Sequence, residues 1–153
     1  MLPERTGWFL LAFSVVTAAQ GARIQDAFQP GKRGAVAPEY LKEKGVVRMR
    51  SVKFRVPLEP PRKLPFAMRL NFFPDKNFEV IWERAARQSG SGLVEWTGRT
   101  RGSPIENAAM VVGGGLVTAN VIPGNRMVYQ VRTAPDSTIW IREFDATSLP
   151  AER

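Results

Sequence analysis

Apolar and polar residues alternate with a period of two through most of the chain after residue 45. This is the pattern of strands that bury one face and expose the other. Pro, Gly, Asn and Asp interrupt the alternation at short intervals, where turns are expected. Eight strands are predicted, over Val46–Val56, Phe66–Phe73, Phe78–Arg87, Leu93–Thr100, Ala108–Val112, Leu116–Ile122, Arg126–Thr133 and Thr138–Phe144. The sequence therefore predicts an all-β fold, an antiparallel meander of about eight strands that closes into a sandwich or a barrel.

The apolar positions change parity within the first predicted strand. Val47 and Met49 occupy odd positions, whereas Val52 and Phe54 occupy even ones. One regular strand would place these two sets on opposite faces, so we predict a β-bulge near Ser51.

Residues 1–21 have the features of a signal peptide. Arg5 supplies a positive charge, and the uncharged run Gly7–Ala19 is too short to span a bilayer as a helix. Small residues follow, and Ala19-Gln20-Gly21 is the preferred cleavage site, ahead of Thr17-Ala18-Ala19. We therefore expect a secreted or periplasmic protein, and a chain without cysteine fits a bacterial exported protein.

Three segments are expected after the signal peptide: a flexible basic arm at 22–45, an antiparallel β domain at 46–145 and a polar C-terminal tail at 146–153. Pro and Gly interrupt the arm repeatedly, and Pro38–Lys44 has room for one helical turn. The positive charge is concentrated near the arm, since residues 23–63 hold eleven Lys and Arg against four Asp and Glu, a net charge of +7. Such a segment is expected to meet an acidic partner or an anionic surface.

The composition limits the chemistry that the chain can perform. It has no histidine and no cysteine, which removes the usual general base, the usual zinc ligands and the thiol nucleophile. The carboxylates at Glu79 and Glu83 lie opposite an apolar strand face and are expected in solvent. We therefore predict a protein that is not an enzyme, and we assign no catalytic, cofactor-binding or metal-binding residue; the other carboxylates considered are Glu95, Glu143 and Asp145.

Other motifs have structural explanations. Gly113–Gly115 is followed by a strand pattern and not by a helix, so it predicts a hairpin turn and not a phosphate-binding loop. The tryptophans have apolar neighbours two residues away and are expected in the core; they are Trp82, Trp96 and Trp140.

A basic set lies in the first strand. Its members could together grip phosphates, but they lack the interleaved aromatic residues that single-strand binding adds, so no nucleic acid is expected as a partner. The set is Arg48, Arg50, Lys53 and Arg55.

Between Phe66 and Glu152, a series of short motifs resembles the N-terminal pro-region of secreted bacterial reprolysin-like (zincin) zinc metallopeptidases. The motifs are Leu70–Asp75, Trp96–Arg99, Val111–Val121, Tyr129–Arg132 and Ile141–Asp145. The resemblance implies a non-catalytic domain that binds a protease domain, in cis or in trans, and assists its folding or keeps it latent. The chain has no His-Glu-x-x-His motif, so no zinc site is carried over from that family.

Two other functions remain open at this stage. One is a stand-alone extracellular ligand-binding or glycan-binding adhesion domain, for which exposed tryptophans would be the mark. The other is an envelope-associated structural protein held at anionic lipid by the basic arm.

Overall fold

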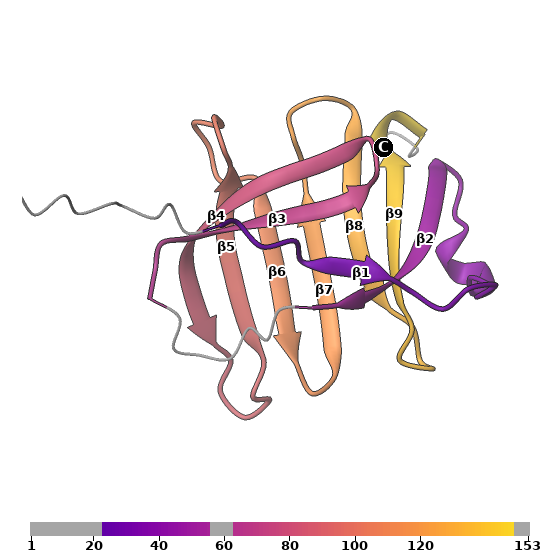
Figure 1. Cartoon of the computed structure of the whole chain (residues 1–153), viewed down its shortest axis with the longest axis horizontal. Coiled ribbons are helices and arrows are strands. Elements are labelled where there is room, and N and C mark those ends of the chain that lie inside the picture. Colours follow the sequence, from indigo (N-terminus) through magenta and orange to yellow (C-terminus); the bar gives the residue numbers. More distant parts are fainter. Residues whose placement is uncertain (1–22, 56–62, 149–153) are drawn as a thin grey trace, which may run out of the picture.

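The computed structural model describes residues 23–55 and 63–148. The predicted signal peptide and most of the predicted C-terminal tail lie outside these residues. The described residues form one antiparallel sheet of nine strands that curls into a nearly closed barrel (Figure 1). The strands are β1 (Phe28–Pro30), β2 (Val46–Phe54), β3 (Phe66–Phe73), β4 (Lys76–Arg87), β5 (Val94–Thr100), β6 (Ala108–Gly113), β7 (Leu116–Val121), β8 (Met127–Thr133) and β9 (Ile139–Asp145). Two 3-10 turns complete the described fold, η1 (Glu39–Leu41) and η2 (Ala146–Ser148).

The all-β prediction is confirmed, and the sheet is barrel-like. Strands β3 to β9 pair in chain order, as in a meander, and β2 then pairs with β9 and β1 with β2. The sheet therefore begins at β1 and ends at β3, and these two strands lie side by side in Figure 1.

The seam between β1 and β3 is held by a few polar contacts instead of a full ladder. The Ala27 N–H donates to the Arg69 carbonyl at 2.9 Å, and the Arg69 N–H donates to the Gln25 carbonyl at 3.0 Å. The Asn71 side chain accepts from the Phe28 N–H and donates to the Phe28 carbonyl, both at 2.9 Å. An asparagine side chain thus replaces one residue of a neighbouring strand.

The inward faces of the strands make a tightly packed aromatic and aliphatic core. Trp82 and Trp96 are almost fully buried, as is Trp140 in a second, smaller cluster, which confirms the expectation for all three. The predicted alternation in β8 is also confirmed, because Tyr129 and Val131 point into the core. The Gly113–Gly115 segment joins β6 to β7 as the predicted hairpin turn.

The predicted bulge near Ser51 is wrong. The β2–β9 register runs without interruption from Arg48 to Val52 and shifts between Val46 and Arg48 instead. Met49 faces outward and is nevertheless sheltered, because Leu41 and Trp140 form a small cluster against it. The parity change therefore reports a strand with two covered faces and not a bulge.

The segment 22–45 was predicted to be an irregular arm, and its described part contributes to the fold instead. Phe28 is 3% exposed and starts strand β1, whose three residues pair with β2. Leu41 is buried in η1, within the segment where one helical turn was predicted, and its carbonyl accepts from Arg142 at 3.2 Å. The strand was missed because three residues give too short an alternation to detect.

Strand β4 turns a corner of the barrel at a register shift between Trp82 and Arg84 (Figure 1). Gly98 on β5 lies opposite Trp82 at this point, and a Cβ built on Gly98 would lie 2.2 Å from the Ile81 carbonyl oxygen. Glycine is the residue that permits such a close backbone approach at a barrel corner.

Replacing Gly98 with alanine should therefore lower the free energy of unfolding by about 2–4 kcal/mol, because backbone and not a flexible side chain must move. Urea unfolding measures the change. Gly90→Ala is the control, since its Cβ would meet nothing within 4 Å and only its positive φ of 82° resists the change, at a cost of about 1 kcal/mol. Equal losses for the two variants would contradict the steric explanation.

Candidate functional site

A charged residue lies inside one end of the barrel. Glu143 of β9 is 6% exposed, and in the register it stands opposite Tyr129 of β8 and Arg48 of β2. Directly opposed residues share a face, so all three side chains point inward. The Tyr129 hydroxyl donates to Glu143 Oε1 at 2.9 Å, and Arg48 Nε donates to Glu143 Oε2.

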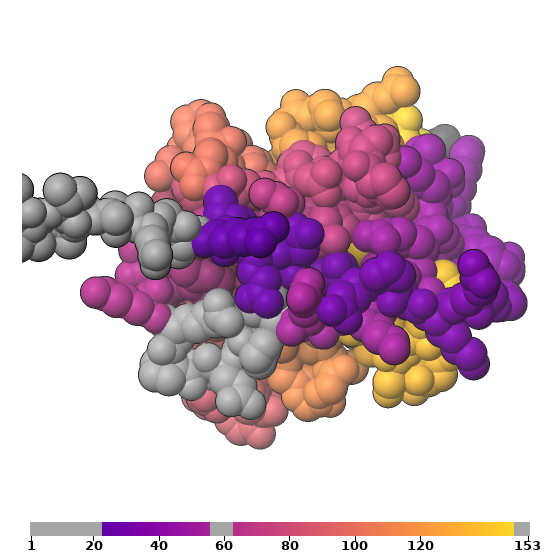
Figure 2. Space-filling model, in the orientation of Figure 1, coloured from indigo at the N-terminus to yellow at the C-terminus, as the bar shows by residue number. Residues whose placement is uncertain are grey.

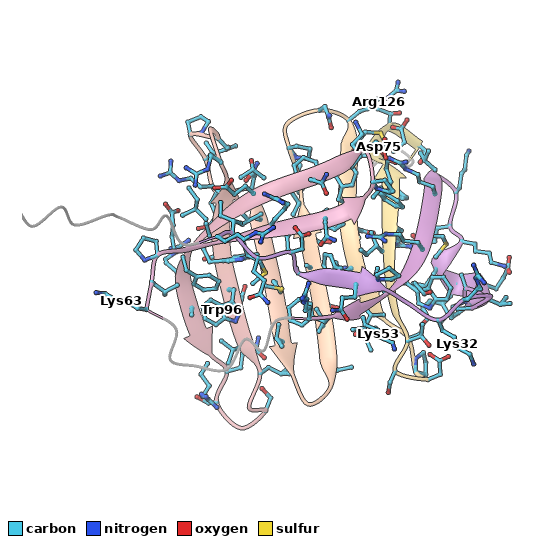
Figure 3. All side chains as sticks on the ribbon, in the orientation of Figure 1. Lys32, Lys53, Lys63, Asp75, Trp96 and Arg126 are labelled. Atoms are coloured by element: carbon cyan, nitrogen blue, oxygen red, sulfur yellow. The ribbon has the colours of Figure 1, made fainter. Side chains whose placement is uncertain are left out.

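Arg48 extends this cluster to the β3–β4 turn. Its Nη1 and Nη2 donate to the two carboxylate oxygens of Asp75 at 2.8 and 2.9 Å, in a bidentate pair. The guanidinium carbon also lies 4.1 Å from the centre of the Phe73 ring. We call Arg48, Asp75, Tyr129 and Glu143 the Arg48 network; Figure 3 labels Asp75 at its outer end.

The environment shifts the pKa values of three groups of the Arg48 network, and each shift favours the protonation state that the hydrogen bonds require. Burial, reinforced by the hydrogen bond to Glu143, raises the pKa of Tyr129 to about 12. The hydrogen bond from Arg48 holds the pKa of Asp75 below its usual range, and the bond to Asp75 chiefly raises the pKa of Arg48. Tyr129 therefore stays a neutral donor at physiological pH and Arg48 stays a cation.

This arrangement binds strands together. One oxygen of Glu143 accepts from Tyr129 and the other from Arg48, so both oxygens are engaged within the fold. The network joins β2, β8 and β9 to the β3–β4 turn, which are otherwise held together by strand pairing and core packing.

The structure separates the basic residues that the sequence grouped in one strand. Arg48 and Arg50 point inward, and Arg50 donates from Nε to the Phe72 carbonyl and from Nη2 to the Asn71 carbonyl, both at 2.6 Å. Lys53 and Arg55 are exposed, and their odd positions differ in parity from those of Arg48 and Arg50, which places them on the opposite side of the chain. The four residues therefore do not form one phosphate-binding surface.

The predicted surface carboxylates are found on the outside of the barrel, and one buried carboxylate was missed. Glu79 pairs with Arg101, and Glu83 pairs with Arg99 at 2.9 Å. The missed carboxylate is Glu143. It has the same parity as Ile139 and Ile141, and this is the sequence signal that it faces inward.

A second candidate site is the free edge of β4. The pairing of β3 with β4 starts at Phe66 and Trp82, so among the described strands the residues after Trp82 have a neighbour, β5, on one side only. We call residues 83–87 the β4 edge. They are all exposed, and residues 83–86 border a groove of about 560 Å³ whose other lining residues are Leu64, Glu95 and Thr97.

The hydrogen-bonding groups of the β4 edge can be placed from the register. The Gln88 N–H donates to the Leu93 carbonyl at 2.8 Å, which makes this a hydrogen-bonded pair of the β4–β5 ladder. Such pairs alternate in antiparallel ladders, so Ala86 bonds to β5 whereas the N–H and C=O of Ala85 and Arg87 point outward.

Within residues 23–55 and 63–148, no helix is long and apolar enough to cross a bilayer. The same residues bring together no group of three or more Asp or Glu side chains that could hold a metal ion. No protein-family model, no curated protein and no solved structure matches the chain. The resemblance to a metallopeptidase pro-region therefore stays a prediction, and function has to be argued from the two sites.

The Tyr129–Glu143 bond should have a measurable signature in alkali. The pKa of the Tyr129 hydroxyl is raised from 10 in the unfolded chain to about 12 in the fold. Tyr129 therefore contributes stability that is present below pH 10 and is lost as the pH rises toward 12. The chain has two tyrosines, so a Tyr40→Phe background leaves Tyr129 as the one reporter. Tyrosinate absorbance should titrate near pH 12, and Tyr129→Phe should cost about 1–3 kcal/mol at neutral pH, because Glu143 loses a buried donor. Titration of Tyr129 near pH 10 would contradict the buried bond.

Proposed function

We propose that this protein is a non-catalytic binding domain that takes up an extended segment of a partner protein as an added strand on the β4 edge. The observation that carries the proposal is the outward main-chain groups of Ala85 and Arg87, next to a groove. Spaced main-chain donors and acceptors are matched best by another extended backbone, which is the basis of strand addition.

The side chains around the edge define the segment that would fit. Ala85 and Ala86 are small, so a bound strand can approach closely, and Leu64 adds an apolar contact in the groove. Glu83 and Arg84 are already paired, with Arg99 and Glu106. Glu95 has no ion-pair partner among the described residues, so the best segment carries small apolar residues and one Lys or Arg that faces Glu95.

Features around the edge also limit unwanted pairing. Charged residues flank the two alanines, and the register shift beside Arg84 bends the strand away from a flat template. Bulges and charges are the usual protection of an exposed edge against aggregation. The edge is thus suited to one selected segment and not to indiscriminate association.

The partner class expected from the sequence is a secreted protease domain, which this domain would assist in folding or hold latent. The exposed basic residues Lys32, Arg33, Lys42 and Lys44 would steer an acidic partner toward the barrel. The glycan-binding alternative is less favoured, because Trp82, Trp96 and Trp140 are buried and offer no stacking platform.

Two substitutions at one residue test the strand-addition site. Ala85→Pro removes the outward N–H without removing a β5 hydrogen bond, whereas Ala85→Ser keeps it. Short random peptides displayed on phage would be selected on the unmodified protein, and the selected peptides titrated by NMR. We expect them to shift the amide signals of Ala85 and Arg87, to bind the serine variant normally and to bind the proline variant at least about tenfold more weakly.

Thermal unfolding of both variants shows whether each remains folded. Peptides that bind the folded proline variant as tightly as the serine variant, or that shift signals elsewhere on the barrel, would overturn the proposed site.

A further inference from the structure

A pocket of about 360 Å³ opens on the seam between β1 and β3. Its walls come from both sides of the seam, with Asp26, Phe28 and Pro30 on one side and Arg69 and Phe73 on the other. Figure 2 shows this face of the molecule, where the indigo β1 segment lies against the magenta β3–β4 hairpin. The volume falls within the range of pockets that hold small organic ligands.

The pocket has an excess of positive charge. Arg50 lines it, and among the described residues Arg50 has no carboxylate partner. Its Nε and Nη2 donate instead to the neutral carbonyls of Phe72 and Asn71. Arg69 makes a long, exposed contact with Asp26 at 3.4 Å. Two guanidinium groups thus face one carboxylate, and the Arg50 charge is not neutralised within the described fold.

An uncompensated and partly buried arginine is costly unless an anion accompanies it. Burial lowers the pKa of Arg50, because the charged guanidinium loses part of its hydration there. The two bonds to carbonyls use Nε and Nη2 of Arg50, so Nη1 is the guanidinium nitrogen that they do not use. The side-chain amide of Asn77 also lines the pocket and can donate to an oxyanion.

The pocket is not purely polar. The exposed rings of Pro30 and Pro74 line it beside the buried rings of Phe28 and Phe73. A neighbouring pocket of about 420 Å³ shares Asp26 and Arg69 with it and adds further arginines, Arg23 and Arg55. The positive potential therefore extends along the seam and would attract anions toward it.

We propose that the seam pocket binds a small organic oxyanion, a carboxylate or a phosphate attached to an apolar or aromatic group, with Arg50 and Arg69 holding the anion and Asn77 donating to it. This site lies on β1, β2, β3, the β3–β4 turn and the first residues of β4, and it shares no lining residue with the groove at the β4 edge, so it is independent of the proposed strand addition.

The test titrates the full chain with benzoate and with phenyl phosphate, which distinguish a carboxylate from a phosphate ligand, and with benzyl alcohol as the uncharged comparison. We expect saturable shifts of the amide signals at Arg69 and Asn77 for at least one of the two anions and none for benzyl alcohol. Failure of both anions to saturate, or equal shifts with benzyl alcohol, would overturn the proposal.

Two variants with the same change in net charge separate a built site from general attraction. Asn77→Asp places a carboxylate in the pocket and should weaken anion binding about tenfold or more. Ser89→Asp puts the same charge in the exposed β4–β5 turn and should leave binding unchanged. Equal weakening by both variants would show that net charge alone attracts the anion and would refute the site.

Arg69→Gln is the second pocket variant, in case Asn77→Asp fails to fold. Among residues 23–55 and 63–148, the one side-chain contact of Arg69 is the exposed contact with Asp26, so its removal should spare the fold and still weaken anion binding. Unchanged anion affinity in folded Arg69→Gln protein would count against the site.

Discussion

Two arginines complete the barrel wall where a strand is missing. Strand β1 ends at Pro30, and beyond it no described strand lies between β2 and β3. Arg50 reaches from β2 to the carbonyls of Phe72 and Asn71, and Arg48 reaches to Asp75 in the turn that follows β3. Guanidinium N–H groups thus supply the donors that a neighbouring backbone would otherwise provide, and the carbonyls at the end of β3 do not remain unsatisfied. The position of the β3–β4 hairpin, and with it the closure of the barrel, depends on these side chains.

This dependence explains why a carboxylate lies inside the barrel. A guanidinium that enters the inner face at Arg48 needs a counter-charge, and Glu143 stands directly opposite it on β9. Glu143 in turn has a second oxygen to satisfy, and the Tyr129 hydroxyl on the next strand does so. Removing Arg48 or Tyr129 would leave the buried Glu143 carboxylate with one oxygen unpaired, which costs more than the lost bond itself contributes. The network is therefore understood as the consequence of an incomplete barrel wall.

The extent to which the sequence predicts this structure follows from how local each signal is. The alternation that places Phe78, Val80 and Trp82 on one face is carried by neighbouring residues, so the strands, the hairpin at Gly113–Gly115 and the buried tryptophans could be predicted. Strand β1 could not, since three residues carry too little pattern. The parity change at Met49 does not indicate a bulge, because the outer face of this strand is covered by Trp140, which is distant in sequence, and by Leu41 of a segment predicted to be irregular. Of the candidate sites, the free edge of β4 depends on where β3 stops, and the seam pocket depends on which strands meet at closure; both are properties of the tertiary fold.

The two proposed sites differ in what occupancy would do to the fold. A strand added at the β4 edge would extend a ladder that is already continuous with β5, so it would gain affinity without rearranging the barrel. An anion in the seam pocket would contact Arg50 from β2 and Arg69 from β3, across the junction where the two ends of the sheet meet without a full ladder. A ligand that binds only the closed seam stabilises the closed barrel in proportion to its concentration and affinity. Because Arg50 is also the residue that bridges β2 and β3, the same charge that holds the wall together would then be the one that senses the ligand.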